Sequence, residues 1–121
     1  MPELDLKLRT KAFAVRIVRL CRKLPQNREG RLIGNQLFRS GTSVAANYRA
    51  ATRAPSRKEF IAKLGIVLEE ADETLFWMEL LAETGVVEPK KLDLIRQENR
   101  EILAIVVAAI NTARLPQRPP K

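Results

Sequence analysis

Residues 56–85 have the sequence SRKEFIAKLGIVLEEADETLFWMELLAETG, and this stretch decides the fold. Its apolar positions recur every three or four residues over about six turns, which is the period of an amphipathic helix and excludes a strand. Ser56 and Glu59 match the Ser-x-x-Glu capping box of a helix start. Gly85 supplies the stop, because glycine adopts the left-handed conformation at little cost. The apolar face consists of Phe60, Leu64, Val67, Ala71, Leu75, Met78 and Ala82.

The same period predicts three further helices on either side of this segment. The first runs from about residue 5 to Pro25, and the second from about residue 29 to residue 53. The fourth begins near Pro89, since proline suits the first helical position. Gly34 and Gly41 lie inside the second helix, where each costs about 1 kcal/mol relative to alanine, so we expect another helix to approach closely there. The apolar stripes are Phe13, Ile17, Leu20 and Leu24; Ile33, Leu37, Val44, Tyr48 and Ala51; and Leu92, Ile95, Ile102, Val106, Ala109 and Ala113, with the polar Asn99 on the same line as the last group.

Four helices with short connections predict an all-α fold, an antiparallel up-down-up-down four-helix bundle. The 121 residues suffice for one domain with a core, which we assign to residues 1–114. Residues 115–121 form a basic, proline-rich tail that we expect to be disordered in isolation. Apolar residues also lie outside the stripes, at Leu8 and Val15 and along residues 102–110. Because a helix that is apolar nearly all round needs more than one neighbour, we expect a homo-oligomer.

The composition excludes several classes of chemistry. The chain has no histidine and one cysteine, which excludes a Cys/His zinc site, a histidine-dependent triad and an internal disulfide. No segment has the length and apolarity of a membrane span, and no signal peptide is recognisable, so we expect a cytoplasmic protein. We also expect no enzymatic activity and no cofactor. An acidic cluster is better explained as a solvated face or a partner for the basic helices than as a metal site, because di-iron bundles require histidine. This cluster consists of Glu69, Glu70, Asp72 and Glu73.

Charge is segregated along the chain. The net charge is +8 at pH 7, but residues 1–58 carry 14 basic and three acidic side chains, whereas residues 59–88 carry one basic and eight acidic ones. One part of the molecule should therefore attract phosphates or an acidic partner. The alternative is that basic and acidic helices neutralise each other within the bundle or between subunits.

Two groups of basic residues are candidates for nucleic-acid binding. Such side chains contact phosphates with salt-sensitive, sequence-independent affinity, which repetition in an oligomer multiplies. Aromatic residues are scarce and mostly at core positions, which favours structured RNA or an RNA–DNA hybrid over stacked single strands. The candidates are Arg9, Arg16, Arg19 and Lys23 on one stripe of the first helix, and Arg49, Arg53, Arg57 and Lys58 around the end of the second.

A polar line runs along the second helix at Gln36, Ser40, Ser43 and Asn47, with Arg39 beside it. Serine and asparagine are poor residues for a helix interior because their side chains compete for backbone hydrogen bonds. We expect Gln36, Arg39, Ser43 and Asn47 to form a structural polar network that fixes helix register or a subunit interface. The alternative is a ligand site facing an axial channel.

Two segments carry a family resemblance: residues 36–47, QLFRSGTSVAAN, and residues 58–64, KEFIAKL. They resemble the small bacterial four-helix bundle family, also called the S23 family or 23S ribosomal RNA intervening-sequence proteins. The resemblance implies an antiparallel bundle without established enzymatic activity, assembled as a ring-like homopentamer. The family includes the accessory subunit of diversity-generating retroelements, which binds nucleic acid and a reverse transcriptase. Residues 48–51 depart from the Ile-Ala-Glu-Gly of many members, so no role of that glutamate is transferred.

The sequence thus predicts a cytoplasmic, oligomeric bundle that binds structured RNA through basic helix surfaces. The alternative is a protein-interaction adaptor, such as an accessory partner of a retroelement reverse transcriptase, whose charged patches bind another protein. Sequestration of the arginines in ion pairs with the glutamate-rich helix would contradict the RNA prediction.

Overall fold

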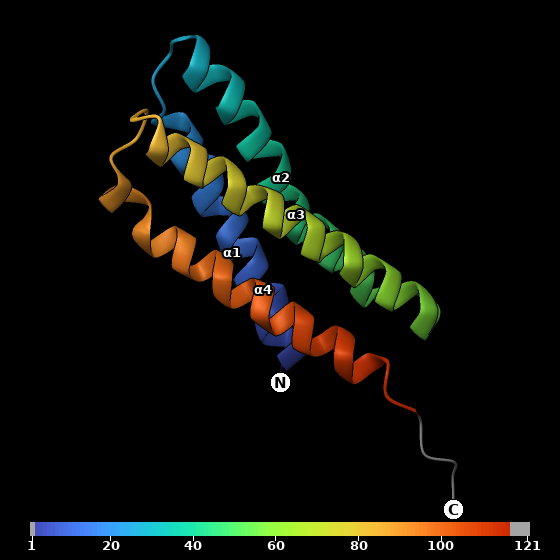
Figure 1. Ribbon diagram of the computed structural model, residues 1–121. Helices are drawn as coiled ribbons and strands as arrows, with labels where there is room; N and C mark the ends of the chain where they lie inside the picture. The colour runs from blue at the N-terminus through green and yellow to red at the C-terminus, as the bar shows by residue number, and fades with distance from the viewer. Residues whose placement is uncertain (1, 117–121) are drawn as a thin grey trace, which may run out of the picture.

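The computed structural model describes residues 2–116, with side chains from residue 6 onward. Successive helices run in opposite directions, so the predicted all-α, up-down-up-down four-helix bundle is confirmed (Figure 1). The elements are α1 (Pro2–Arg22), α2 (Arg28–Thr52), α3 (Arg57–Glu83), the short 3-10 helix η1 (Pro89–Leu92) and α4 (Asp93–Ala113). Residues 117–121, the larger part of the expected tail, lie outside the described residues.

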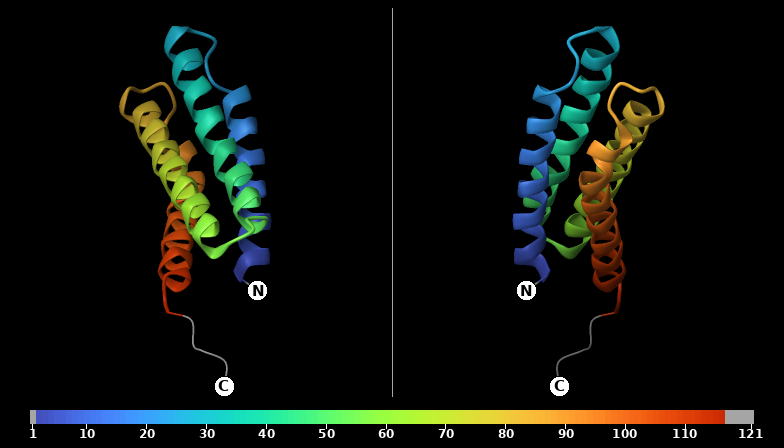
Figure 2. Two further views of the ribbon diagram at one scale, coloured as in Figure 1. Left: turned by 90° about the vertical axis from the view of Figure 1, so that its right-hand side faces the viewer. Right: turned by 90° about the vertical axis from the view of Figure 1, so that its left-hand side faces the viewer.

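The two ends of the bundle differ in their connections (Figure 2). The start of α1, the turn between α2 and α3 at residues 53–56, and the end of α4 lie together at what we call the turn end. The connections at residues 23–27 and 84–92 lie together at the opposite, loop end. The 25 residues of α2 connect the two ends and span about 37 Å at 1.5 Å per residue.

Local signals set most of the helix boundaries. The Ser56 hydroxyl accepts a hydrogen bond from the Glu59 amide at 3.1 Å, which confirms the Ser56 half of the predicted capping box at the start of α3. Gly85 has φ of 74°, the left-handed conformation expected after α3. The predicted α-helical start at Pro89 is wrong, because residues 89–92 form the 3-10 turn. The Lys91 amide donates to the Glu88 carbonyl at 3.0 Å, and α4 begins only at Asp93.

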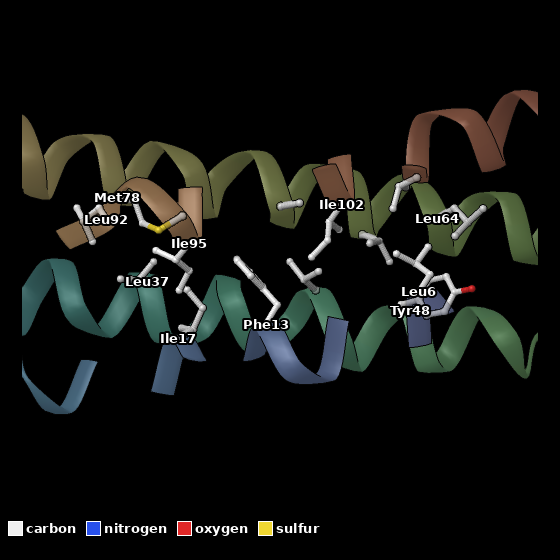
Figure 3. Packing of buried hydrophobic residues seen from close by; sticks show 14 of the residues in the cluster. Leu6, Phe13, Ile17, Leu37, Tyr48, Leu64, Met78, Leu92, Ile95 and Ile102 are labelled. Carbon is white, nitrogen blue, oxygen red and sulfur yellow. The ribbon is translucent and has the colours of Figure 1, made fainter. Parts of the chain in front are cut away.

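The core lies where the stripes of the four helices meet (Figure 3). Phe13, Leu37, Met78 and Ile102, one from each long helix, have no exposed surface. Asn99 is also fully buried, and neither polar atom of its side chain has a hydrogen-bond partner among the described residues. Some buried residues were not part of the predicted stripes, among them Leu6, Thr10, Thr74, Leu81 and Ile110. Some residues of the predicted stripes are only partly buried, among them Leu20, Ile33, Phe60, Ala82 and Ala109.

The predicted close approach of another helix is confirmed at Gly41. A Cβ there would lie 2.7 Å from Cγ2 of Ile17, which is shorter than van der Waals separation, so α1 and α2 pack at a distance that requires glycine at this position. At Gly34 the neighbour is not a helix, because a Cβ would lie 2.9 Å from Cδ1 of Leu24, in the connection after α1.

Gly41→Ala should therefore lower the free energy of unfolding by about 1 to 3 kcal/mol, since the added methyl group overpacks the core. The matched control is Gly65→Ala in α3, where a Cβ meets nothing within 4 Å. That variant should gain up to about 1 kcal/mol from helix propensity. Urea unfolding followed by circular dichroism at a fixed protein concentration measures both. Equal effects of the two substitutions would contradict this account of the α1–α2 contact.

Candidate nucleic-acid interface

The eight basic candidates separate into three groups, and the first is Arg9 alone. Its guanidinium forms a two-pronged contact with Glu98 of α4, at 2.6 Å from Nη2 to Oε1 and 3.1 Å from Nε to Oε2. Nη2 also lies 3.1 Å from Oε1 of Glu101. The hydrogen bonds to Glu98 raise the pKa of Arg9 further above its ordinary value. Arg9 thus ties α1 to α4, and its charge is neutralised within the bundle.

The second group, Arg16, Arg19 and Lys23, lines a groove between α1 and the start of α4 at the loop end. The groove has a volume of about 650 Å³. Its cationic rim also includes Lys91, whereas its floor is apolar. Leu94 lies at its edge with 79% of its surface exposed. We call it the α1–α4 groove, and its lining is Arg16, Arg19, Leu20, Lys23, Leu24, Pro25, Val86, Val87, Glu88, Lys91, Leu94 and Ile95.

The third group, which we call the turn-end cluster, consists of Arg49, Arg53, Arg57 and Lys58. All four side chains are exposed, and within residues 6–116 none lies within 4 Å of a carboxylate. Nη2 of Arg57 donates to the carbonyl oxygen of Leu115 at 2.6 Å, which fixes that guanidinium beside the end of α4. The cluster lies at the opposite end of the bundle from the α1–α4 groove, so the candidates form two positive surfaces rather than one continuous face.

The polar line of α2 resolves into two local pairs. Nδ2 of Asn47 donates to the Ser43 hydroxyl at 2.7 Å and to its carbonyl at 3.0 Å. Nε of Arg39 donates to Oε1 of Gln36 at 3.3 Å. No hydrogen bond joins the two pairs in the part of the chain that the structure describes. The buried Ser40 hydroxyl donates to the Leu37 carbonyl of its own helix.

Arg39 clamps α2 to α3. Its Nη1 lies 3.0 Å from Oε2 of Glu70, and its Nη2 forms an ion pair with Glu73. The indole nitrogen of Trp77 donates to the same Glu73 oxygen at 2.9 Å. These contacts lower the pKa of Glu73, first through the Trp77 hydrogen bond and then through Arg39. Two members of the acidic cluster thus act as partners for a basic helix.

Other reactive chemistry is limited in the described part of the chain. Residues 6–116 contain no group of three or more acidic, cysteine or histidine side chains placed to hold a metal ion. Burial raises the pKa of Cys21 to about 11, so its thiol is protonated at neutral pH. None of the described helices is both long and apolar enough to cross a membrane.

Several residues of the candidate surfaces were missed at the sequence level. Leu94 enters the α1–α4 groove from the start of α4, Lys91 from η1, and Glu88 from the connection before η1. Leu94 did carry a signal, because it lies off the stripe of Leu92 and Ile95 among polar neighbours. The contact between Arg39 and Glu70 spans 31 residues and has no local signature.

This geometry defines the class of protein. It is a small antiparallel helical bundle with segregated charge and two separate cationic surfaces. The family model described as 23S rRNA-intervening sequence protein matches residues 2–108, and the chain belongs to this family. A crystal structure of a protein from the S23 ribosomal protein family of Bacteroides thetaiotaomicron VPI-5482 matches with a TM-score of 0.87 and 38% sequence identity. The match covers 92% of this chain and 99% of that chain. A search of curated proteins gives no match.

The contact between Glu73 and Trp77 predicts an acid-dependent loss of stability. A carboxyl group whose pKa is lowered by folding stabilises the fold above its ordinary pKa, and this contribution disappears as the pH falls through the lowered value. Glu73→Gln should therefore reduce the free energy of unfolding at pH 7, by less than about 1 kcal/mol because the site is partly exposed. The difference from the wild type should begin to shrink as the pH falls below the ordinary pKa of 4.5 and should vanish only below the lowered pKa of the folded state.

Unfolding curves at several pH values, followed by Trp77 fluorescence, measure this difference. Asp72→Asn removes the same charge from a neighbouring exposed position and is the matched control. Two results would contradict a charged Glu73 as the partner of Arg39 and Trp77. One is a loss of free energy of unfolding in Glu73→Gln that does not change with pH. The other is a loss equal to that of the Asp72→Asn control.

Proposed function

We propose that this protein is a non-enzymatic, oligomeric bundle that binds structured RNA through basic helix surfaces, chiefly the turn-end cluster. The observation that carries the proposal is the exposure of Arg49, Arg53, Arg57 and Lys58 around one turn, without a carboxylate within 4 Å in the described chain. The family description, 23S rRNA-intervening sequence protein, agrees with an RNA ligand.

The cluster suits phosphates rather than bases. Arginine and lysine at an exposed helix end contact backbone phosphates and release counterions, which gives affinity without sequence specificity. Phe38 and Phe76 are exposed, at 46% and 52%, but neither belongs to the turn end. Because stacking on aromatic side chains is the usual basis of single-strand binding, the turn end favours the shape and backbone of structured RNA.

Self-association is part of the proposal. Leu8 and Val15 on α1 are 64% and 41% exposed, and Leu94 and Val107 on α4 are 79% and 43% exposed. The single bundle leaves these apolar side chains exposed. Burial of their surface against further copies of the chain would stabilise an assembly. The resemblance favours a pentamer. Several turn-end clusters on one assembly would raise RNA affinity through avidity. A cytoplasmic location stays a prediction.

A second candidate is a protein-interaction adaptor, such as an accessory subunit of a retroelement reverse transcriptase. The α1–α4 groove favours this alternative, because Leu94 and Ile95 give it an apolar lining that RNA does not need. Stoichiometric co-purification with a polymerase, together with no RNA affinity of the isolated protein, would favour the adaptor.

RNA binding should be strongly salt-dependent. Fluorescence anisotropy with a labelled RNA hairpin should give a linear fall of log K with log salt, steeper when more phosphates are contacted. Arg49→Gln with Arg53→Gln should weaken binding and reduce the magnitude of the slope by about 1.4 to 1.8 per bound copy.

The control removes two positive charges from exposed positions of α1 outside both surfaces, Lys11→Gln with Arg22→Gln. It should retain most of the affinity. Absent binding at moderate salt, binding without salt dependence, or an equal loss in the control would overturn RNA binding by the turn-end cluster.

A further inference from the structure

The α1–α4 groove carries an excess of positive charge. Its cations are Arg16 and Arg19 on α1, Lys23 directly after α1, and Lys91 on η1, against one carboxylate, Glu88. All four cationic side chains are exposed. No ion pair within 4 Å joins them to a carboxylate in residues 6–116. The groove therefore attracts an occupant with negative charge.

The same groove has an apolar wall. Leu20, Val86 and Val87 are half-buried along it, and Leu94 at its edge is the most exposed of the large apolar residues whose exposure the structure describes. The phosphates of a nucleic acid would pair with the cations but leave this apolar surface in contact with water. A segment of a protein can supply acidic and apolar side chains together, so the lining favours a protein as the occupant.

The shape of the groove favours a helix. The rim from Arg16 to Lys23 is about 10 Å long, which is two helical turns. Because side chains rather than a sheet edge form the walls, an extended segment would find no backbone partners there, whereas a helix bonds its own backbone groups. A small ligand would remain largely in water beside a residue as exposed as Leu94, although sites for small molecules usually enclose most of the ligand.

We infer that the α1–α4 groove binds a short acidic, amphipathic helix of a partner protein. About two turns of this helix lie along the groove, in keeping with the length of the rim. Its apolar side chains cover Leu94, and its carboxylates, one turn apart along one flank, face Arg16, Arg19 and Lys23. Such charge complementarity selects the partner and speeds its encounter more than it adds affinity.

This site is separate from the surfaces of the proposed function. The turn-end cluster lies at the opposite end of the bundle, so the inference does not depend on RNA binding (Figure 2). Among the four exposed apolar residues considered for contacts between copies, Leu94 lines the groove, and the inference assigns it to the partner helix. Leu8, Val15 and Val107 remain for self-association.

A designed peptide tests the site. The probe is a fluorescein-labelled peptide of about 15 residues, a length at which an isolated helix becomes stable, with leucines on one face and glutamates along one flank of that face. One control peptide has the same composition in an order that forms no apolar face, and a second has lysine in place of glutamate. Fluorescence anisotropy with the full chain should give at least about tenfold tighter binding of the probe than of either control.

Charge reversal in the groove should invert this preference. The groove variant, Arg16→Glu with Lys23→Glu, should bind the glutamate probe at least about tenfold more weakly than the wild type and should prefer the lysine peptide. Leu94→Asn keeps the charges and removes the exposed apolar side chain, so it should weaken probe binding by a similar factor. Lys11→Glu with Arg22→Glu makes the same charge change at exposed positions outside the groove and should retain most of the affinity. Circular dichroism confirms that each variant is folded.

Three results with the peptides would overturn the inference. They are no binding of the probe by the wild type, equal binding of the peptide without an apolar face, and an equal loss of affinity in the Lys11→Glu, Arg22→Glu control. Two further results would assign the groove to another occupant and also overturn it. A change of oligomeric state in the groove variant, measured by sedimentation velocity, would indicate a second copy. Loss of RNA-hairpin affinity in the groove variant but not in the turn-end variant would indicate RNA.

RNA binding by the turn-end cluster is scored separately. Loss of RNA affinity in Arg49→Gln with Arg53→Gln, with probe binding unchanged, supports two independent sites. A wild type that binds the probe in the groove but binds no RNA supports the inference and overturns only the proposed function.

Discussion

Burial of one apolar stripe per helix fixes the rotation of each helix, and every outward surface depends on that rotation. With Phe13 and Ile17 in the core, α1 turns the stripe of Arg9 and Arg16 toward α4. With Met78 in the core, α3 turns Phe76 outward. The close passage of Ile17 over Gly41 leaves little freedom for α1 to rotate. The candidate surfaces are therefore consequences of core packing.

The parts of the structure that depend on local chemistry were predictable from the sequence. The Ser56 cap, the stop at Gly85 and the buried stripes follow from spacings of a few residues. Contacts between helices were not, because Arg9 and Glu98 are 89 residues apart and their meeting depends on how far α4 is displaced along α1. The α1–α4 groove combines a helix, a connection and the start of another helix, so no single pattern in the sequence predicts it.

Segregated charge serves two roles in this structure. Arg39 with Glu70 and Glu73, and Arg9 with Glu98, neutralise charge between neighbouring helices. The groove and the turn-end cluster retain their charge, within residues 6–116, at opposite ends of the bundle. Ion pairs at partly exposed positions contribute little stability, so these contacts act mainly by selecting which helix faces lie together. The sequence left internal neutralisation and an external positive surface as alternatives, and the structure contains features of both.

Asn99 is the one polar residue among the buried residues of α4. A buried amide without a protein partner costs about 1 to 3 kcal/mol, so packing alone would favour leucine at this position. Leucine would, however, make the stripe from Leu92 to Ile110 uniformly apolar, and a shift of α4 by one turn would then still bury apolar groups. A polar core residue defines register where it meets a polar partner, and Asn99 meets none among the described residues. The register of α4 therefore depends on the fit of its apolar stripe and on the contact of Glu98 with Arg9. The register of α4 places Glu98 against Arg9 and Leu94 beside the cationic rim. The fit of α4 in the core thus determines the chemistry of the surface.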